Sequence, residues 1–155
     1  MTVDSFSREK NWKLLYLRSN KLHRAKQLGF EYPKMSESDL KASRTTNVLF
    51  ICSMNQWRSP TAEKVYSNKS LITARSAGVN RNARIKVNSH LLKWADVVFA
   101  MEEKHKNRLL AAFPAEMKYK ELVVLHIPDD YKFMSPDLVE EITLTVDPVL
   151  KRLAG

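Results

Sequence analysis

From residue 47 onward, short apolar runs alternate with segments whose apolar residues recur every three or four positions. Apolar runs of this length predict buried strands. Four are present: Val48–Cys52, Leu71–Ala77, Val97–Met101 and Leu122–Ile127. The segments between and after them predict four helices: Ser59–Ser67, Asn88–Trp94, Glu102–Ala112 and Pro136–Leu153.

This alternation predicts an α/β fold, because strand–helix–strand units join parallel strands. We expect a three-layer open sandwich in which helices cover both faces of a four-stranded parallel sheet. Right-handed crossovers bring the carboxyl ends of such strands to one edge, where ligands usually bind. Cys52, Met101 and the Pro128–Asp130 segment each follow a strand, so we expect all three at that edge.

Residues 1–45 have a different pattern. A helix is predicted from about Arg8 to Leu28, and Gly29 ends it. The segment carries ten Lys and Arg against five Asp and Glu. We therefore expect two parts, a basic helical N-terminal extension (1–45) and an α/β domain (46–155). The basic helix either packs on the domain or offers a surface to a protein or nucleic acid.

Composition limits the location and the partners that we expect for the protein. The chain has 155 residues and one cysteine, so it forms no internal disulfide. We see no apolar run that would cross a membrane and no signal-peptide pattern, so we expect no membrane partner and a reducing, cytoplasmic location. The net charge of +9 favours anionic partners such as phosphorylated substrates. Nucleic acid stays among the partners this charge allows, although no defined nucleic-acid motif is present.

The candidate chemistry lies around the single cysteine. Cys52 ends a predicted strand, Arg58 follows six positions later, and Ser59 and Pro60 begin a predicted helix that Ser59 is placed to cap. A loop backed by a helix N-terminus binds a phosphate-sized anion and favours thiolate over thiol. Arg58 suits two phosphate oxygens, and Ser59 suits the sulfur. These features indicate a cysteine-dependent phosphatase, whereas the simpler interpretation of Cys52 is a small buried apolar residue.

The segment Val48–Glu63 resembles the signature of the low-molecular-weight protein tyrosine phosphatases, and it looks closest to small bacterial predicted tyrosine phosphatases. Ala74–Gly78, Ala95–Glu102 and Ile127–Tyr131 match further segments, and the resemblance covers residues 47–150. It implies a flavodoxin-like fold of the phosphatase type. It also implies hydrolysis of phosphotyrosine or a similar aryl phosphate through a phosphocysteine, with no cofactor or metal.

The same resemblance implies roles for individual residues. Cys52 would be the nucleophile, Arg58 the phosphate clamp and Ser59 the partner of the thiolate. Asn55 would hold the loop with a left-handed backbone. The loop residues expected to bind substrate, or a phosphate or sulfate anion in its place, are Ser53, Met54, Asn55, Gln56, Trp57 and Ser59.

Two loop positions depart from the family pattern. Met54 stands where glycine is usual, and Trp57 stands where a second cysteine is usual, so a disulfide cannot protect the loop. Trp57 either stacks on a phosphotyrosine ring or packs at the start of the helix. Both alternatives stay open at the level of the sequence.

A phosphate monoester also needs a proton on its leaving oxygen. The family places an aspartate directly before a proline, but here Asp129 and Asp130 follow Pro128. We narrowly favour Asp129 over Asp130 as the general acid. Tyr131 and Phe133 are candidates for an aromatic wall beside it, although Phe133 equally suits core packing.

Two other functions compete with a phosphatase for a phosphorylated protein or small aryl phosphate. An arsenate reductase shares this loop, but its thioredoxin-coupled form uses further cysteines that the chain lacks. A non-catalytic anion-binding or regulatory module is the other alternative. The four histidines show no metal-ligand spacing with Cys52 and are expected to be surface or packing residues.

Overall fold

The computed structural model describes residues 45–154. The predicted N-terminal extension, apart from its last residue, and its predicted helix therefore lie outside the described residues. Residues 46–145 form one compact unit. Within residues 45–154, no helix combines the length and apolar character that a bilayer crossing requires.

The unit is built on a sheet of four parallel strands in the order β2-β1-β3-β4. The strands are β1 (Thr46–Cys52), β2 (Ile72–Gly78), β3 (Val97–Ala100) and β4 (Glu121–Val124). The two central strands, β1 and β3, are buried along almost their whole length, which explains their continuous apolar runs. The predicted α/β class and four-stranded parallel sheet are confirmed.

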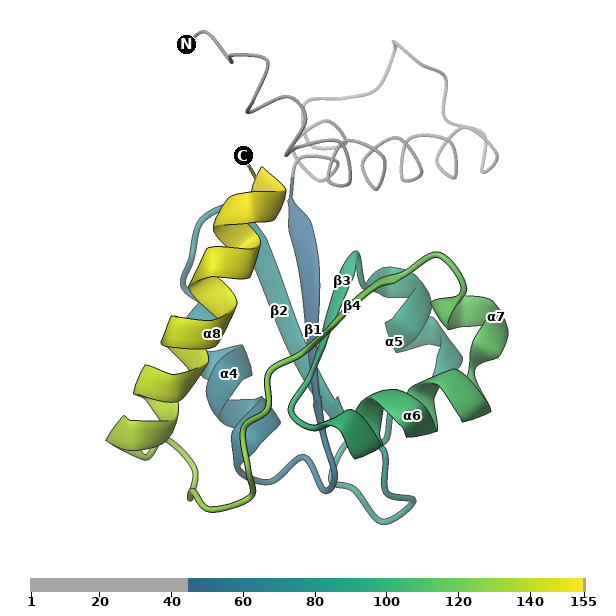
Figure 1. Ribbon diagram of the computed structural model, residues 1–155, viewed down its shortest axis with the longest axis horizontal. Helices are drawn as coiled ribbons and strands as arrows, with labels where there is room; N and C mark the ends of the chain where they lie inside the picture. Colours follow the sequence, from purple (N-terminus) through teal and green to yellow (C-terminus); the bar gives the residue numbers. More distant parts are fainter. Residues whose placement is uncertain (1–44, 155) are drawn as a thin grey trace, which may run out of the picture. The chain divides into compact units, whose positions relative to one another are not determined.

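Helices cover both faces of the sheet. They are α4 (Arg58–Tyr66), α5 (Ser89–Trp94), α6 (Glu103–Ala112), α7 (Pro114–Met117) and α8 (Pro136–Ala154). Figure 1 shows α4 and the first turns of α8 on one side of the sheet, with α5, α6 and α7 on the other. The predicted layers are confirmed, and α7 is a short helix that the sequence pattern did not reveal.

Alternation along β1 divides the core between the two faces. The ring of Phe50 stacks on Tyr66 of α4 at a centroid distance of 5.6 Å. Leu49 and Ile51 instead share a buried cluster with apolar residues that include Leu92 of α5 and Leu109 of α6. Burial on both faces fixes the register of β1, and so it fixes the position of its last residue.

The last strand is shorter than predicted: it was expected to reach Ile127, but it ends at Val124. His126 has a φ of 56°, a left-handed conformation that interrupts the ladder. The N–H groups of Leu125 and Ile127 nevertheless donate to Ala100 and Met101 at 2.9 and 2.8 Å. The chain therefore stays beside the end of β3 as it approaches Pro128.

Candidate active site

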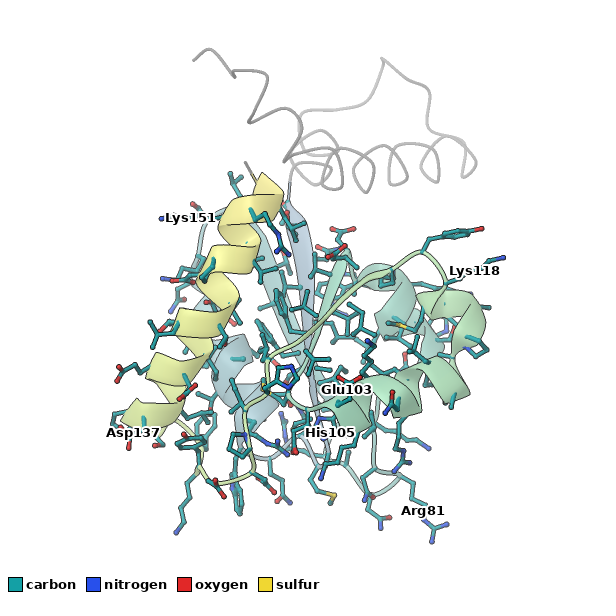
Figure 2. The ribbon with its side chains drawn as sticks, in the orientation of Figure 1. Arg81, Glu103, His105, Lys118, Asp137 and Lys151 are labelled. Atoms are coloured by element: carbon teal, nitrogen blue, oxygen red, sulfur yellow. The ribbon has the colours of Figure 1, made fainter. Side chains whose placement is uncertain are left out.

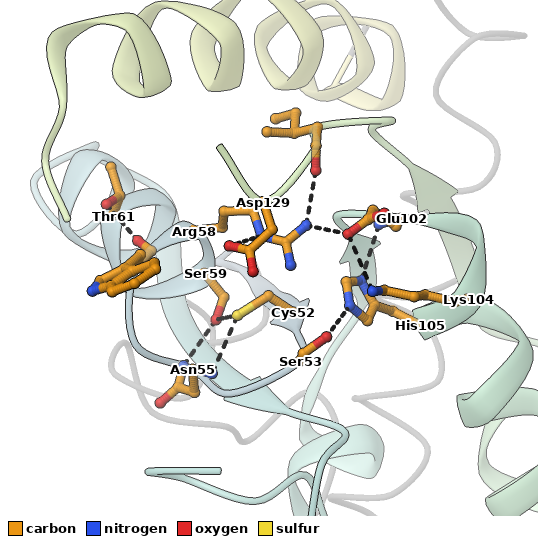
Figure 3. Close-up of polar contacts among 12 residues, drawn as sticks. Cys52, Ser53, Asn55, Arg58, Ser59, Thr61, Glu102, Lys104, His105 and Asp129 are labelled. Atoms are coloured by element: carbon orange, nitrogen blue, oxygen red, sulfur yellow. Dashed lines mark hydrogen bonds and ion pairs between the residues drawn. The ribbon is translucent and has the colours of Figure 1, made fainter. Parts of the chain in front are cut away.

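Cys52 is the last residue of β1 and is only 3% exposed. Its Sγ lies 2.9 Å from Ser59 Oγ and accepts the Asn55 N–H at 3.2 Å (Figure 3). Ser59 Oγ accepts a hydrogen bond from Asn55 Nδ2 at 2.9 Å, and its one proton can be donated either to the sulfur or to the Ala77 carbonyl, which lies farther away at 3.4 Å. The sulfur is thus held between the Asn55 backbone and the Ser59 hydroxyl.

The loop between β1 and α4, residues 52–58, is called the cysteine loop below. Asn55 is fully buried with a φ of 56°, so the expected left-handed backbone is confirmed. Its Nδ2 donates to Ser59 Oγ and to Ser76 Oγ of β2, each at 2.9 Å. The expected capping role of Ser59 is wrong, because α4 begins at Arg58 and the Ser59 hydroxyl serves Cys52 and Asn55 instead.

A second segment, residues 79–84, holds the carbonyls of the cysteine loop. The N–H groups of Val79, Asn80 and Arg84 donate to three successive carbonyls of the loop, each at 3.0 Å. Arg84 Nε donates to a fourth, the carbonyl of Asn55, at 3.0 Å. The carbonyls of the loop are thus engaged, and its N–H groups, apart from that of Asn55, which donates to Cys52 Sγ, remain for an anion.

This close approach requires Gly78 at the end of β2. A Cβ at this position would meet the carbonyl oxygen of Ser53 at 2.4 Å and the Cβ of Ala83 at 2.6 Å. The glycine therefore lets the two segments come together.

Arg58 is the first residue of α4, and its side chain is 2% exposed. Its Nη1 donates to Glu102 Oε1 at 2.5 Å and to the Ile127 carbonyl at 2.9 Å. Its Nε lies 3.5 Å from Asp129 Oδ1. Partial burial raises the pKa of Glu102, but the hydrogen bond and charge of Arg58 outweigh it and hold that pKa below its ordinary value. The guanidinium is thus fixed beside the thiol.

Sequence reasoning missed Glu102 and His105, which link β3 and α6 to the loop. His105 is fully buried at the start of α6 (Figure 2). Its Nδ1 accepts the Glu102 N–H at 3.0 Å, and its Nε2 lies 2.8 Å from Ser53 Oγ. Burial, and next the charge of Arg58, lower the pKa of His105 to about 4. The ring is therefore neutral near pH 7. Because Nδ1 accepts the Glu102 N–H, the proton is on Nε2, which donates a hydrogen bond to Ser53 Oγ.

A sequence signal for these two residues does exist. Glu102 follows β3 at the same sheet edge as Cys52, and its spacing to His105 forms a capping box at the start of α6. The expectation that every histidine is an ordinary surface or packing residue is therefore too narrow for His105, which hydrogen-bonds Ser53 of the cysteine loop.

The segment 128–133, called the acidic loop below, meets the cysteine loop through Asp129. The Asp129 side chain is 56% exposed and lies against Arg58. Within residues 45–154, no hydrogen bond or ion pair joins Asp130 or Tyr131 to the cysteine loop. The structure thus brings Asp129 to Arg58 and shows no such contact for Asp130 or Tyr131.

The remaining candidates lie at the surface of the cysteine loop. Met54 is half-buried, Gln56 is exposed and Trp57 is 43% exposed. Trp57 therefore presents part of its ring to solvent. Among residues 45–154, no group of three or more His, Cys, Asp or Glu side chains is arranged to hold a metal ion.

Comparisons with known proteins bear on the fold. No model of a known protein family matches the chain, and no curated protein matches it. Solved structures do match. A low-molecular-weight protein tyrosine phosphatase from T. tengcongensis is 22% identical with a TM-score of 0.55, over 70% of this chain and 97% of that one.

Two further solved structures are similar. The tyrosine phosphatase Wzb from Escherichia coli K30, in complex with phosphate, is 22% identical with a TM-score of 0.52, over 71% of this chain and 96% of that one. The YwlE arginine phosphatase from Geobacillus stearothermophilus is 21% identical with a TM-score of 0.50, over 70% and 90%. The chain therefore has the fold of the low-molecular-weight protein tyrosine phosphatases.

Proposed function

We propose that residues 46–155 hydrolyse phosphate monoesters through a phosphocysteine at Cys52. One observation carries this proposal: a buried thiol, which accepts the Asn55 N–H and lies 2.9 Å from the Ser59 hydroxyl, shares a short loop with a buried arginine at a helix N-terminus. A helix N-terminus and a guanidinium together stabilise the charge of a transferring phosphoryl group. The arrangement is typical of covalent catalysis with an activated nucleophile.

In the first step, the Cys52 thiolate attacks phosphorus. A sulfur–phosphorus bond forms, and the phosphorus–oxygen bond to the leaving group breaks with its electron pair on that oxygen. Arg58 and the loop N–H groups hold the three remaining phosphoryl oxygens. Asp129, as a carboxylic acid, gives its proton to the leaving oxygen.

In the second step, water attacks the phosphocysteine. Asp129, now a carboxylate, takes a proton from that water. The sulfur–phosphorus bond breaks, its electron pair returns to Cys52, and the Ser59 hydroxyl donates to the departing thiolate. Inorganic phosphate is released, and both residues regain their starting protonation states.

The contact between Asp129 and Arg58 supports Asp129 rather than Asp130 as the acid. Arg58 Nη1 is committed to Glu102 and to the Ile127 carbonyl, whereas its Nε meets an exposed carboxylate. A dianionic phosphate competes for this Nε more strongly than one carboxylate does. Substrate binding would therefore release Asp129 from Arg58 and leave it beside the leaving oxygen.

Aryl phosphates, with phosphotyrosine as the natural example, are the substrates that the residues support best. Trp57 and Phe133 are both large exposed aromatics, 43% and 47% exposed, and come from the two loops that meet at Arg58. Offset or edge-to-face contact with an aryl ring suits such side chains. One structural neighbour is an arginine phosphatase, so phosphoarginine is the comparison substrate.

The test is hydrolysis of para-nitrophenyl phosphate across about pH 5 to 8 by wild type, Cys52→Ser, Asp129→Asn and Asp130→Asn. We expect turnover that disappears in Cys52→Ser and is far more sensitive to Asp129→Asn than to Asp130→Asn. Phosphotyrosine and phosphoarginine are then compared under the same conditions. Turnover of phosphoarginine alone would move the substrate class to phosphoramidates.

The non-catalytic alternative has a distinct outcome. Phosphate binding by a folded wild-type protein, with no turnover above the Cys52→Ser background, would overturn the proposal in favour of an anion-binding module. Isothermal titration with inorganic phosphate supplies that measurement, and circular dichroism verifies that each variant is folded.

A further inference from the structure

A groove of about 570 Å³ adjoins the cysteine loop. Trp57, Pro60, Lys64 and Ser67 line it at helical spacing, so the outward face of α4 forms one of its walls. Arg84 also lines it, from the segment that holds the loop carbonyls, and so does Phe133 of the acidic loop. The groove is thus built from the same segments as the proposed anion site, but neither Cys52 nor Arg58 lines it.

The charged side chains of the groove favour an anionic occupant. Arg84 is tied to the cysteine loop through the Asn55 carbonyl, which fixes one cation beside the loop. Lys64 is exposed, with its Nζ 5.9 Å from the centroid of the Phe133 ring. The one lining carboxylate, Glu63, already accepts a hydrogen bond from Ser76 Oγ. Two cations and one carboxylate leave the groove with a net positive charge, and charge complementarity favours a negative partner.

The aromatic residues of the groove favour a polypeptide over other anions. Trp57 and Phe133 expose 43% and 47% of their surface, and large aromatic anchors of this kind are typical of protein-binding sites. A polypeptide places one acidic side chain among apolar neighbours. A nucleic acid would instead bring successive phosphates close to the carboxylate of Glu63.

We propose that this groove binds the residues flanking the phosphorylated residue of a polypeptide substrate, and that it selects an acidic side chain among them. The inference rests on the proposed function, because the phosphorylated residue itself enters at Cys52. Selection acts on substrate binding rather than on the chemical step, since Lys64 and Phe133 do not touch Cys52.

The first test measures kcat/KM for two phosphotyrosine peptides that differ only in carrying Glu or Lys on both sides of the phosphotyrosine. We expect wild type to prefer the Glu peptide by about fivefold, the size of one exposed ion pair, and the preference to shrink at high salt. Lys64→Glu should remove or invert the preference through KM, with hydrolysis of para-nitrophenyl phosphate unchanged.

Lys118→Glu is the matched control for net charge. Lys118 lies beyond α7, away from α4 (Figure 2), and should keep the wild-type preference. Equal loss of preference in both charge variants would overturn the groove as its source and assign it to the overall charge. Equal kcat/KM of wild type for both peptides would also overturn the inference.

A binding measurement separates this inference from the proposed function. Fluorescence anisotropy of the two labelled peptides is measured with Cys52→Ser and with Cys52→Ser/Lys64→Glu, so no turnover is needed. A Glu preference that depends on Lys64 supports the groove even if para-nitrophenyl phosphate is not hydrolysed. A single-stranded oligonucleotide that displaces the Glu peptide more effectively than unlabelled peptide does would overturn the assignment to polypeptide.

Discussion

The cysteine loop and the acidic loop meet at the guanidinium of Arg58, and they are held very differently. In the cysteine loop, Cys52, Asn55 and Arg58 are all buried and hydrogen-bonded to neighbouring segments. In the acidic loop, Asp129 is 56% exposed and meets Arg58 at 3.5 Å. The half of the site that would bind the anion is thus organised before substrate arrives. The half that would transfer the proton is held by the 3.5 Å contact of Asp129 and by hydrogen bonds near its ends.

This difference has an energetic consequence. A preorganised anion site spends no free energy on reorganisation during the reaction, so its donors contribute strongly to the rate. The acidic loop is anchored near both ends. Before it, the Ile127 N–H donates to the Met101 carbonyl, and after it, the Met134 N–H donates to Thr61 Oγ1 at 2.9 Å. Changes in the cysteine loop should therefore reduce activity more than changes in the acidic loop.

The largest effect is expected for Arg58→Lys. Lysine keeps the charge but loses the planar fork, so it cannot contact Glu102, the Ile127 carbonyl and a phosphate together. We expect kcat/KM for para-nitrophenyl phosphate to fall about 10³-fold. Lys64→Arg, on the exposed face of the same helix, is the control. If Arg58→Lys lowered kcat/KM by less than about tenfold, the guanidinium would not be the phosphate clamp.

The next effect concerns the acidic loop. Asp129→Asn should lower kcat about 10²-fold for a substrate with a poor leaving group, because the leaving oxygen then departs without a proton. Asp130→Asn should change kcat less than about threefold, because it has no contact with Arg58. A series of aryl phosphates of different leaving-group basicity measures this. Equal losses in both variants would contradict the assignment.

A smaller effect is expected for His105→Asn in denaturant unfolding. Asparagine keeps an acceptor for the Glu102 N–H but loses the bond to Ser53, so the free energy of unfolding near pH 7 should fall by about 1 kcal/mol. The pKa of His105 is lowered from 6.5 to about 4. Between these values the unfolded chain binds a proton that the folded ring does not, so stability should decline as pH falls through this window.

His105→Asn should flatten that decline, and His90→Asn, at an exposed position, should leave it as in wild type. Urea unfolding at about pH 7 and about pH 4.5 provides the comparison. An unchanged pH dependence in His105→Asn would show that this ring is not the titrating group.

The smallest effect, that of Met134→Gly, is set against a change at Asn55, a second residue with a left-handed backbone. Asn55 and Met134 have φ values of 56° and 60°. Met134→Gly should raise the free energy of unfolding by less than about 1 kcal/mol, because glycine removes left-handed strain. Asn55→Gly should lower it, because two buried hydrogen bonds from Nδ2 disappear. Destabilisation by both would mean that Met134 makes side-chain contacts that matter more than its backbone.

The sequence predicted the regular elements well where burial decided them. The strands at Val48–Cys52 and Val97–Met101 were placed within two residues because they are buried on both faces. It failed where a single backbone dihedral decided the outcome. The end of β4 depends on the left-handed His126, and the enrichment of histidine at positive φ is too weak a signal to place a strand end.

The residues of the candidate site also fall into two groups, those whose proximity was predictable and those whose proximity was not. Cys52, Arg58, Ser59 and Asn55 lie on one short segment, so their proximity was predictable from spacing and resemblance. Glu102, His105 and Arg84 reach the loop from other elements, and only the parallel sheet topology brings them together. The position of Glu102 after β3 and its spacing to His105 place these two residues at the right edge of the sheet, but the hydrogen bonds to Arg58 and Ser53 depend on tertiary structure.

The central claim is a covalent phosphocysteine at Cys52. The most direct test is rapid mixing of the wild-type protein with an aryl phosphate, followed by quenching within one turnover and peptide mass spectrometry. We predict one phosphoryl group on Cys52, a matching burst of phenolate, and neither signal in Cys52→Ser. Steady turnover with an unmodified Cys52 at every quench time, or with the phosphoryl group on another residue, would contradict the account.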